Sequence, residues 1–211
     1  SDATETEGTS LVHTVTMSGE ADAPRTYAFG TTDVTATSGD DYNSSATFSD
    51  GVTYAGGLIT VPAGVTSFTV TFTSTDDAID EATETYTVSA GGQDGTGTIL
   101  DNDAALISVN DATVTEGGTL NFTVSLSTPS ATDVLFTPSF SNVTTTNADY
   151  TQTPIQYSTD GGATYQTWTS GAITIPAGTP PASRIRPSAS RIAVPAVITS
   201  STISTRLPAS G

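Results

Sequence analysis

One sequence pattern occurs twice in this chain of 211 residues, and the repeat limits the fold to two copies of one domain. Ala3–Gly8 (ATETEG) recurs as Ala112–Gly117 (ATVTEG). Asp41-Tyr42 recurs 108 residues later, and Ile59–Gly64 (ITVPAG) recurs 114 residues later as ITIPAG. A spacing of this size is typical of one immunoglobulin-like sandwich, which contains about 100 residues.

Alternating apolar positions in both copies indicate half-buried strands, and helix signals are almost absent. Leu11–Met17 and Phe68–Phe72 show the alternation, and frequent Gly or Pro residues interrupt it. We therefore expect an all-β fold of tandem immunoglobulin-like antiparallel β-sandwiches, the second incomplete. His13 stands where the second copy has Phe122, so we expect it in the core rather than as a ligand or base.

The two copies differ at both ends. Leu106–Val109 predicts a strand at the start of the second copy, whereas only Ser1-Asp2 stands there in the first, so we expect the first sandwich to lack its first strand. We predict a first sandwich over residues 1–103, a truncated second repeat over 104–179 and an atypical Arg-, Ser- and Pro-rich tail over 180–211. The tail replaces an expected strand and acidic loop, which favours a reading-frame shift or foreign joint near residue 180 over a divergent natural tail.

The segment Asp76–Glu84 holds five carboxylates in nine residues. At about 5 Å and an effective dielectric near 20, each close pair repels by roughly 3 kcal/mol. The chain has no Lys, four of its five Arg follow residue 183, and 17 of its 22 acidic residues lie in residues 1–103. A fold that gathers these carboxylates needs a cation, and oxygen ligands without His or Cys favour Ca²⁺. The alternative is a solvated acidic loop.

Charge and composition exclude several classes of function. The net charge of -17 disfavours binding to nucleic acid and to anionic membrane surfaces. No apolar run is long enough to insert into a bilayer. The chain has no Cys and a single His, at an expected core position, and it contains no nucleophile motif, so we do not expect an enzyme.

Four short motifs follow one another in the first copy. They are Glu7-Gly8, Asp41-Tyr42, the acidic run from Asp76 to Tyr86, and Gly97–Asp103 (GTILDND). In these motifs the chain resembles Calx-beta domains, the calcium-binding sandwiches of sodium–calcium exchangers that are also repeated in large bacterial surface adhesins. The resemblance covers nearly all of residues 3–103 and, more weakly, residues 106–178.

The resemblance also implies which carboxylates bind Ca²⁺. The second copy lacks the acidic loop and the closing acids, and only two of its positions match. The implied candidate ligands are Glu7, Asp41, Asp76, Asp77, Glu81, Glu84, Asp101 and Asp103 in the first copy, and Glu116 and Asp149 in the second.

These observations favour a calcium-binding structural spacer repeat of a secreted or cell-surface adhesin, bacterial by resemblance. Ca²⁺ would rigidify the domain ends and the linkers, so the expected partners are neighbouring repeats of the same chain, with a host or surface glycan or protein as a further candidate. Two alternatives stay open. One is a module that recognises a glycan or protein through the hairpin Asp160–Trp168, and the other is a calcium sensor like those of exchangers.

Overall fold

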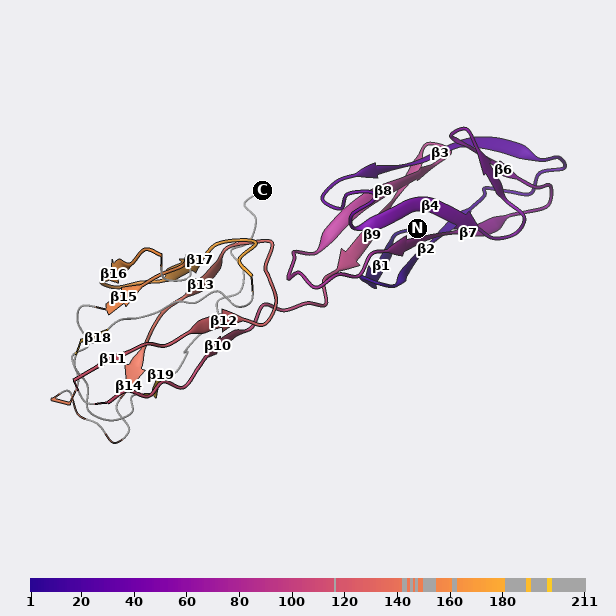
Figure 1. The fold of residues 1–211 in the computed structure, drawn as a ribbon. Helices are drawn as coiled ribbons and strands as arrows, with labels where there is room; N and C mark the ends of the chain where they lie inside the picture. Colours follow the sequence, from indigo (N-terminus) through magenta and orange to yellow (C-terminus); the bar gives the residue numbers. More distant parts are fainter. Residues whose placement is uncertain are drawn as a thin grey trace. The chain divides into compact units, whose positions relative to one another are not determined.

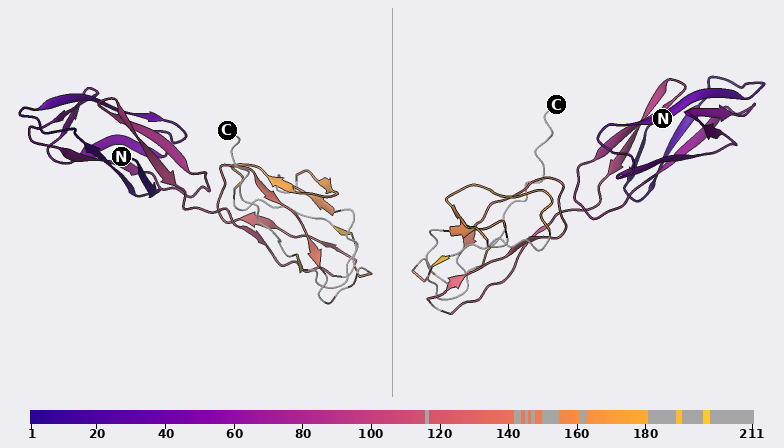
Figure 2. Two further views of the ribbon diagram at one scale, coloured as in Figure 1. Left: turned by 180° about the vertical axis from the view of Figure 1, so that it is seen from behind. Right: turned by 45° about the horizontal axis from the view of Figure 1, so that its top comes forward.

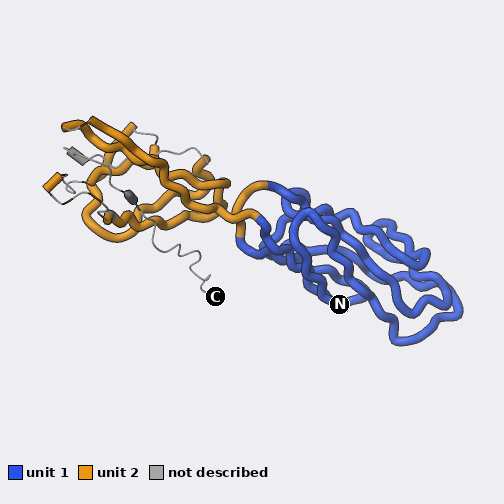
Figure 3. The backbone as a smooth tube through the Cα atoms, turned by 90° about the horizontal axis from the view of Figure 1, so that it is seen from below, with its two compact units in different colours: residues 1–77, 82–102 blue, residues 78–81, 103–211 orange. Residues whose placement is uncertain are grey.

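The computed structural model describes residues 1–115, 117–141, 144, 146, 148–149, 155–160, 163–180, 189–190 and 197–198. The chain divides into two compact units (Figure 3). The first consists of Ser1–Asp77 and Ala82–Asn102, and the second of Ala78–Glu81 and Asp103–Gly211.

The first unit is a sandwich of two β-sheets (Figure 1), and Figure 2 shows it from two further sides. One sheet has the strand order β1-β9-β8-β3-β6-β5, and the other has the order β2-β7-β4. The strands are β1 (Ala3–Thr6), β2 (Ser10–Thr16), β3 (Arg25–Asp33), β4 (Tyr42–Phe48), β5 (Thr53–Ala55), β6 (Leu58–Val61), β7 (Ser67–Ser74), β8 (Glu84–Ala90) and β9 (Gln93–Leu100). The expected all-β fold is confirmed. Its pairs are antiparallel except for β1, which runs parallel to β9.

The core of the first unit lies between its two sheets and follows the alternation in the sequence. In β7, Phe68, Val70 and Phe72 are buried, while the residues between them face outward. Leu11 of β2 is opposite Phe72 and is also buried. Each large apolar side chain buried in this way contributes about 1.5–3 kcal/mol, so the alternation fixes which face of each strand lies inside.

Two tyrosine rings join the sheets at the centre of this core. Tyr42 of β4 stacks on Tyr86 of β8 with ring centroids 4.2 Å apart, and both are fully buried. The Tyr42 hydroxyl donates to Asp33 Oδ1 at 2.7 Å, and the Tyr86 hydroxyl lies 3.0 Å from His13 Nε2. Burial raises the pKa of both tyrosines, so both hydroxyls stay protonated.

The expected core position of His13 is confirmed, because the side chain is 1 % exposed. Burial lowers its pKa below the ordinary value of 6.5, against the opposing effect of the Ser1 carbonyl near Nδ1. The ring is therefore neutral in the folded chain at neutral pH.

We expect the free energy of unfolding to fall as the pH drops below about 6.5, because the unfolded chain then binds a proton that buried His13 does not. The stability due to neutral His13 is complete above that pH and is lost toward the lowered pKa of the folded state. The free energy of unfolding of the wild type and of His13→Phe can be measured by denaturant unfolding from about pH 8 to pH 5. As the pH falls, this free energy should decrease more steeply for the wild type than for His13→Phe. The same slope in both proteins would contradict this prediction.

The second unit contains shorter strands. They are β10 (Ile107–Val109), β11 (Thr119–Leu120), β12 (Val124–Leu126), β13 (Val134–Phe136), β14 (Phe140–Ser141), β15 (Ile155–Tyr157), β16 (Gln166–Trp168), β17 (Ile173–Ile175), β18 (Ala189–Ser190) and β19 (Val197–Ile198). They pair two by two, all antiparallel, as β10-β12, β11-β18, β13-β17, β14-β19 and β15-β16. Ile107 and Val109 pack against a core that contains Val124 and Leu126.

Candidate metal centre

Hydrogen bonds within the first unit fix both the backbone and the carboxylate of Asp41. It precedes β4, and its carboxylate accepts a hydrogen bond from the Thr37 backbone at 2.6 Å. Its own backbone N–H donates to the Thr37 carbonyl at 3.0 Å, and its carbonyl accepts from the Thr75 N–H at 2.9 Å. Because β4 and β7 are antiparallel neighbours, the start of β4 lies beside the end of β7, where the acidic run begins.

Asp41 forms a group of three carboxylates with Glu81 and Glu84. One carboxylate oxygen from each residue lies within 4.8 Å of the other two, and all three side chains are half-buried. Glu84 begins β8, opposite Ile99 of β9, so its backbone belongs to the sheet. Glu81 precedes it by three residues in the acidic segment.

A second acidic group lies in the first unit and contains Glu7 and Asp76. Glu7 is 8 % exposed, and its Oε1 accepts the Asn102 backbone N–H at 3.1 Å. The Asn102 side-chain amide donates to Asp76 Oδ1 at 3.2 Å. A Cβ on Gly8, whose φ is +74°, would lie 2.9 Å from the Asp76 Cβ, so the Glu7-Gly8 motif needs glycine both for its backbone and for this close approach.

Five of the implied ligands thus fall into two groups, Glu7 with Asp76 and Asp41 with Glu81 and Glu84. The groups are linked through the backbone, because the Thr75 N–H that bonds the Asp41 carbonyl belongs to the residue before Asp76. Asp77 follows Asp76 directly, and Asp101 precedes Asn102. Asp103 is the first residue of the second unit after Asn102.

Asp80 takes a different role from its acidic neighbours. In the second unit its backbone N–H donates to the Pro129 carbonyl and its carbonyl accepts from the Ala131 N–H, both at 2.9 Å. Its carboxylate Oδ2 accepts from the Ser130 hydroxyl at 2.8 Å, and Ser130 is 2 % exposed. The Asp80 carboxylate is thus used in a hydrogen bond within the protein, and the pattern of acidic residues in the sequence does not reveal this role.

The structure gives less support to the two candidate ligands that the resemblance implies in the second copy. Asp149 closes a local turn, in which its carboxylate accepts from the Thr146 backbone N–H at 2.7 Å and from the Thr146 hydroxyl at 2.9 Å. Among the described residues, Asp149 belongs to no group of three metal-binding side chains. Glu116 lies outside the described residues.

The group of Asp41, Glu81 and Glu84 fits a calcium ion. Ca²⁺ binds oxygen ligands at about 2.3–2.6 Å, so two ligand oxygens on opposite sides of one ion are separated by roughly 5 Å. The observed limit of 4.8 Å among the three carboxylate oxygens meets this condition. The shortage of positively charged side chains also favours a bound cation at this group, because the chain has no Lys and only Arg25 precedes residue 184.

The structure adds two features to this centre that the sequence alone did not indicate. Asn102 bridges Glu7 and Asp76 through its backbone and side chain, and Thr75 fixes the Asp41 carbonyl. The sequence feature that could have pointed to Asn102 is its position between the candidate ligands Asp101 and Asp103. Thr75 carries no comparable signal, because its role depends on the pairing of β4 with β7.

Within the portion of the chain that the structure describes, no helix is both long and apolar enough to cross a membrane.

Comparison with known proteins identifies the family of the chain. The curated proteins gave no match. Among solved structures, the crystal structure of CBD12 from CALX1.2 is 16% identical with a TM-score of 0.41, covering 90% of this chain and 73% of that one. The calcium binding domain CBD12 of CALX1.1 is 18% identical with a TM-score of 0.38, covering 93% and 76%. The Calx-beta domain model matches residues 2–105 and 100–149, and this chain belongs to the Calx-beta domain family.

Proposed function

We propose that this chain is a calcium-binding structural spacer of a secreted or cell-surface adhesin, in which Ca²⁺ rigidifies the acidic end of the first unit and the linker that leaves it. The observation that carries the proposal is the group of Asp41, Glu81 and Glu84, whose carboxylate oxygens lie within 4.8 Å of one another. The family of the chain supports the same ion.

Asp41, Glu81 and Glu84 would hold the ion, and Glu7 and Asp76 would add charge beside them. Bound Ca²⁺ supplies the positive charge that offsets the repulsion among these carboxylates. Asp41 is fixed by Thr37 and Thr75, so little side-chain entropy remains to be lost there on binding. Glu81 and Glu84 are three residues apart, and Glu84 begins β8. An ion bound by both side chains would restrain the backbone between them, where the acidic segment leads into β8.

Glu84→Gln tests the site with an isosteric change. It removes one ligand charge and one strong oxygen donor while keeping the side-chain shape, so we expect calcium affinity to fall at least tenfold, which corresponds to about 1.4 kcal/mol. Isothermal titration of the full chain with CaCl₂ measures the affinity.

The matched control is Glu5→Gln. Glu5 is an exposed residue of β1, and its replacement makes the same change in net charge, so the affinity should stay close to that of the wild type. If both variants lost affinity equally, the effect would come from net charge alone, and the assignment of Glu84 as a ligand would be wrong.

The proposed partners are neighbouring repeats of the same chain, since a spacer acts through its ends. A calcium sensor would use the same carboxylates, but it would also change conformation in a way that another domain reads. Small-angle scattering separates the two functions. A spacer should become more extended and stiffer with Ca²⁺, whereas a sensor should switch between two defined forms.

Recognition of a glycan by the second unit is less well supported. Trp168 packs against the core of that unit, and its indole N–H donates to the Gly171 carbonyl at 2.9 Å. Asp160 accepts hydrogen bonds from Ser158 and Thr164, which lower its pKa and keep it in the turn. Both residues thus serve the local structure of this unit, which leaves them less available to a ligand.

A further inference from the structure

Three segments of the chain fit the acceptor pattern for N-glycosylation, which is Asn-x-Ser/Thr with any residue except proline in the middle. They are Asn43-Ser44-Ser45, Asn121-Phe122-Thr123 and Asn142-Val143-Thr144. The pattern itself does not choose among them. An acceptor segment must lie on the surface, with both its Asn amide and its hydroxyl accessible to the transferase. The structure allows this test for the first two segments, because residues 142 and 143 lie outside the described residues.

The first segment lies on a bulge of an edge strand. Within the described residues, β4 is at the edge of the sheet β2-β7-β4. Asn43 pairs with Thr73 and Thr47 pairs with Thr71, so the three residues of β4 between these pairs stand opposite the single residue Phe72 of β7. The bulge takes these residues out of the regular ladder, and their backbone can therefore fit the binding site of an enzyme without breaking the sheet.

The side chains of this segment that take part in glycosylation are accessible. Asn43, Ser44 and Ser45 are all exposed. The Asn43 Oδ1 accepts the Ser45 backbone N–H at 2.9 Å, which holds the two residues of the pattern close together. Among the described residues, neither the Asn43 Nδ2 nor the Ser45 hydroxyl has a hydrogen-bond partner. The nitrogen that would receive the sugar and the hydroxyl that the pattern requires are therefore both available.

The second segment is held within its unit. Its middle residue Phe122 is 5 % exposed and belongs to a hydrophobic core cluster. Asn110 accepts the Thr123 N–H through its side chain and donates from its backbone to the Thr123 carbonyl at 3.1 Å. A transferase would have to break these contacts to bind the segment, so the folded chain does not offer Asn121 for modification.

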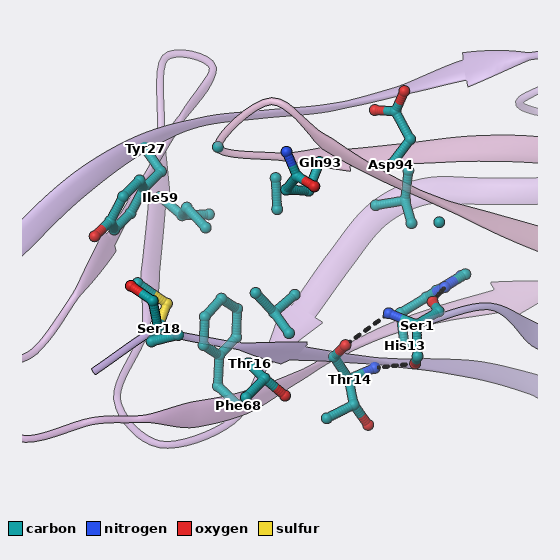
Figure 4. A pocket seen from close by; sticks show the side chains of 16 residues that line it. Ser1, His13, Thr14, Thr16, Ser18, Tyr27, Ile59, Phe68, Gln93 and Asp94 are labelled. Atoms are coloured by element: carbon teal, nitrogen blue, oxygen red, sulfur yellow. Dashed lines mark hydrogen bonds between the residues drawn. The ribbon is translucent and has the colours of Figure 1, made fainter. Parts of the chain in front are cut away.

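The opposite edge of the same sheet differs in character from the β4 edge. There β2 forms one wall of a groove of about 540 Å³, whose lining includes the core side chains Ile59 and Phe68 (Figure 4). None of the residues that line this groove belongs to β4. A glycan is bulky and polar, and it suits the exposed polar residues of the β4 bulge, where it would cover no groove and no apolar floor.

We propose that Asn43 is an N-glycosylation site. The donor is an oligosaccharide carried on a lipid pyrophosphate, and the Asn43 Nδ2 attacks C1 of its first sugar. A C–N bond forms, the bond between C1 and the pyrophosphate oxygen breaks with its electron pair on that oxygen, and Nδ2 gives up one proton to a base of the transferase. The inference rests on the secretion of the chain in the proposed function and not on its calcium site.

A glycan on Asn43 would also protect the edge of the sheet. An exposed edge strand presents unpaired backbone groups to other chains, and proteins commonly cover or interrupt such edges. A bulky group on the β4 bulge would prevent a strand of another chain from pairing there.

Glycan transfer to the purified full chain tests the proposal, with a purified oligosaccharyltransferase and an oligosaccharide on a polyprenyl pyrophosphate as the donor. Mass spectrometry of the proteolytic peptides should find the glycan on Asn43 and none on Asn121. A synthetic peptide of residues 118–126, in which Asn121 is released from the fold, should accept the glycan. A folded chain that stays unmodified at Asn43 while this peptide is modified would overturn the proposal, as would transfer to Asn121 in place of Asn43.

Two matched variants show whether the acceptor pattern directs the transfer. Ser45→Ala removes the required hydroxyl and should lower the yield at Asn43 at least tenfold. Ser44→Ala makes the same change at the middle position, where the pattern allows any residue except proline, and should keep the wild-type yield. Both residues are exposed, so both variants should keep the wild-type melting temperature.

Equal yields from these two variants would overturn the proposal, because the transfer would then not depend on the acceptor pattern. Calcium affinity is measured separately by titration. Failure of glycosylation with normal calcium binding would thus count against the site at Asn43 alone, whereas loss of calcium binding would count against the proposed function.

Discussion

Removal of calcium with EDTA should lower the melting temperature of the first unit by about 10–20 °C. An ion present at about 100 times its dissociation constant stabilises the folded state by about 2.7 kcal/mol, and each kcal/mol shifts a domain of this size by roughly 4–8 °C. Near-UV circular dichroism contains the signal of the buried Tyr42–Tyr86 stack of the first unit, and Trp fluorescence follows the second unit alone through Trp168, the one Trp of the chain.

Two observations separate calcium binding from general charge screening. Excess Ca²⁺ should restore the melting temperature, while the same concentration of Mg²⁺ should restore less, because Mg²⁺ demands a smaller octahedral site. The Trp168 transition should move less than the tyrosine signal, since the three-carboxylate group includes Asp41 and Glu84 of the first unit. A tyrosine transition that is the same with EDTA and with Ca²⁺ would refute the proposed function.

Gly97→Ala should destabilise the first unit by about 3 kcal/mol, the upper end of the range for overpacking. A Cβ at this position would lie 2.2 Å from two ring carbons of Tyr86. The backbone cannot yield easily, because Gly97 pairs with Ala3 on one side and with Tyr86 on the other. The Tyr86 ring would have to leave its stack with Tyr42, and thermal unfolding followed by near-UV circular dichroism measures the loss.

Gly30→Ala is the matched control for this change. Gly30 lies in β3 of the same sheet, and a Cβ there would meet nothing within 4 Å. Its melting temperature should stay close to that of the wild type or rise slightly, because alanine restricts the unfolded chain more than glycine. Equal melting temperatures for the two variants would show that the sheet accommodates a methyl group at position 97 and that the Tyr86 contact is not restrictive.

The sequence predicts most of the first unit because its signals are local. Alternation in Phe68–Phe72 reports which side chains face the core, and the structure places them there. The motifs also predict where acidic residues gather, and the structure brings Asp41, Glu81 and Glu84 together.

Other features depend on contacts between residues far apart in the chain, and no local pattern encodes them. The parallel pairing of β1 with β9 has the same alternation as an antiparallel pair. Asp80 looks like its acidic neighbours, yet its carboxylate accepts a hydrogen bond from Ser130.

The parallel pairing of β1 with β9 has a mechanical consequence. Among the strands described in the first unit, β1 is the first and β9 the last, and the two run side by side in the same direction from Ala3 and Gly97 to Thr6 and Leu100. Tension applied to the two ends of this unit would therefore slide these strands past each other. In that geometry the hydrogen bonds between them share the load and must break together, whereas peeling would break them one at a time. A repeat built in this way is suited to bearing a pulling force.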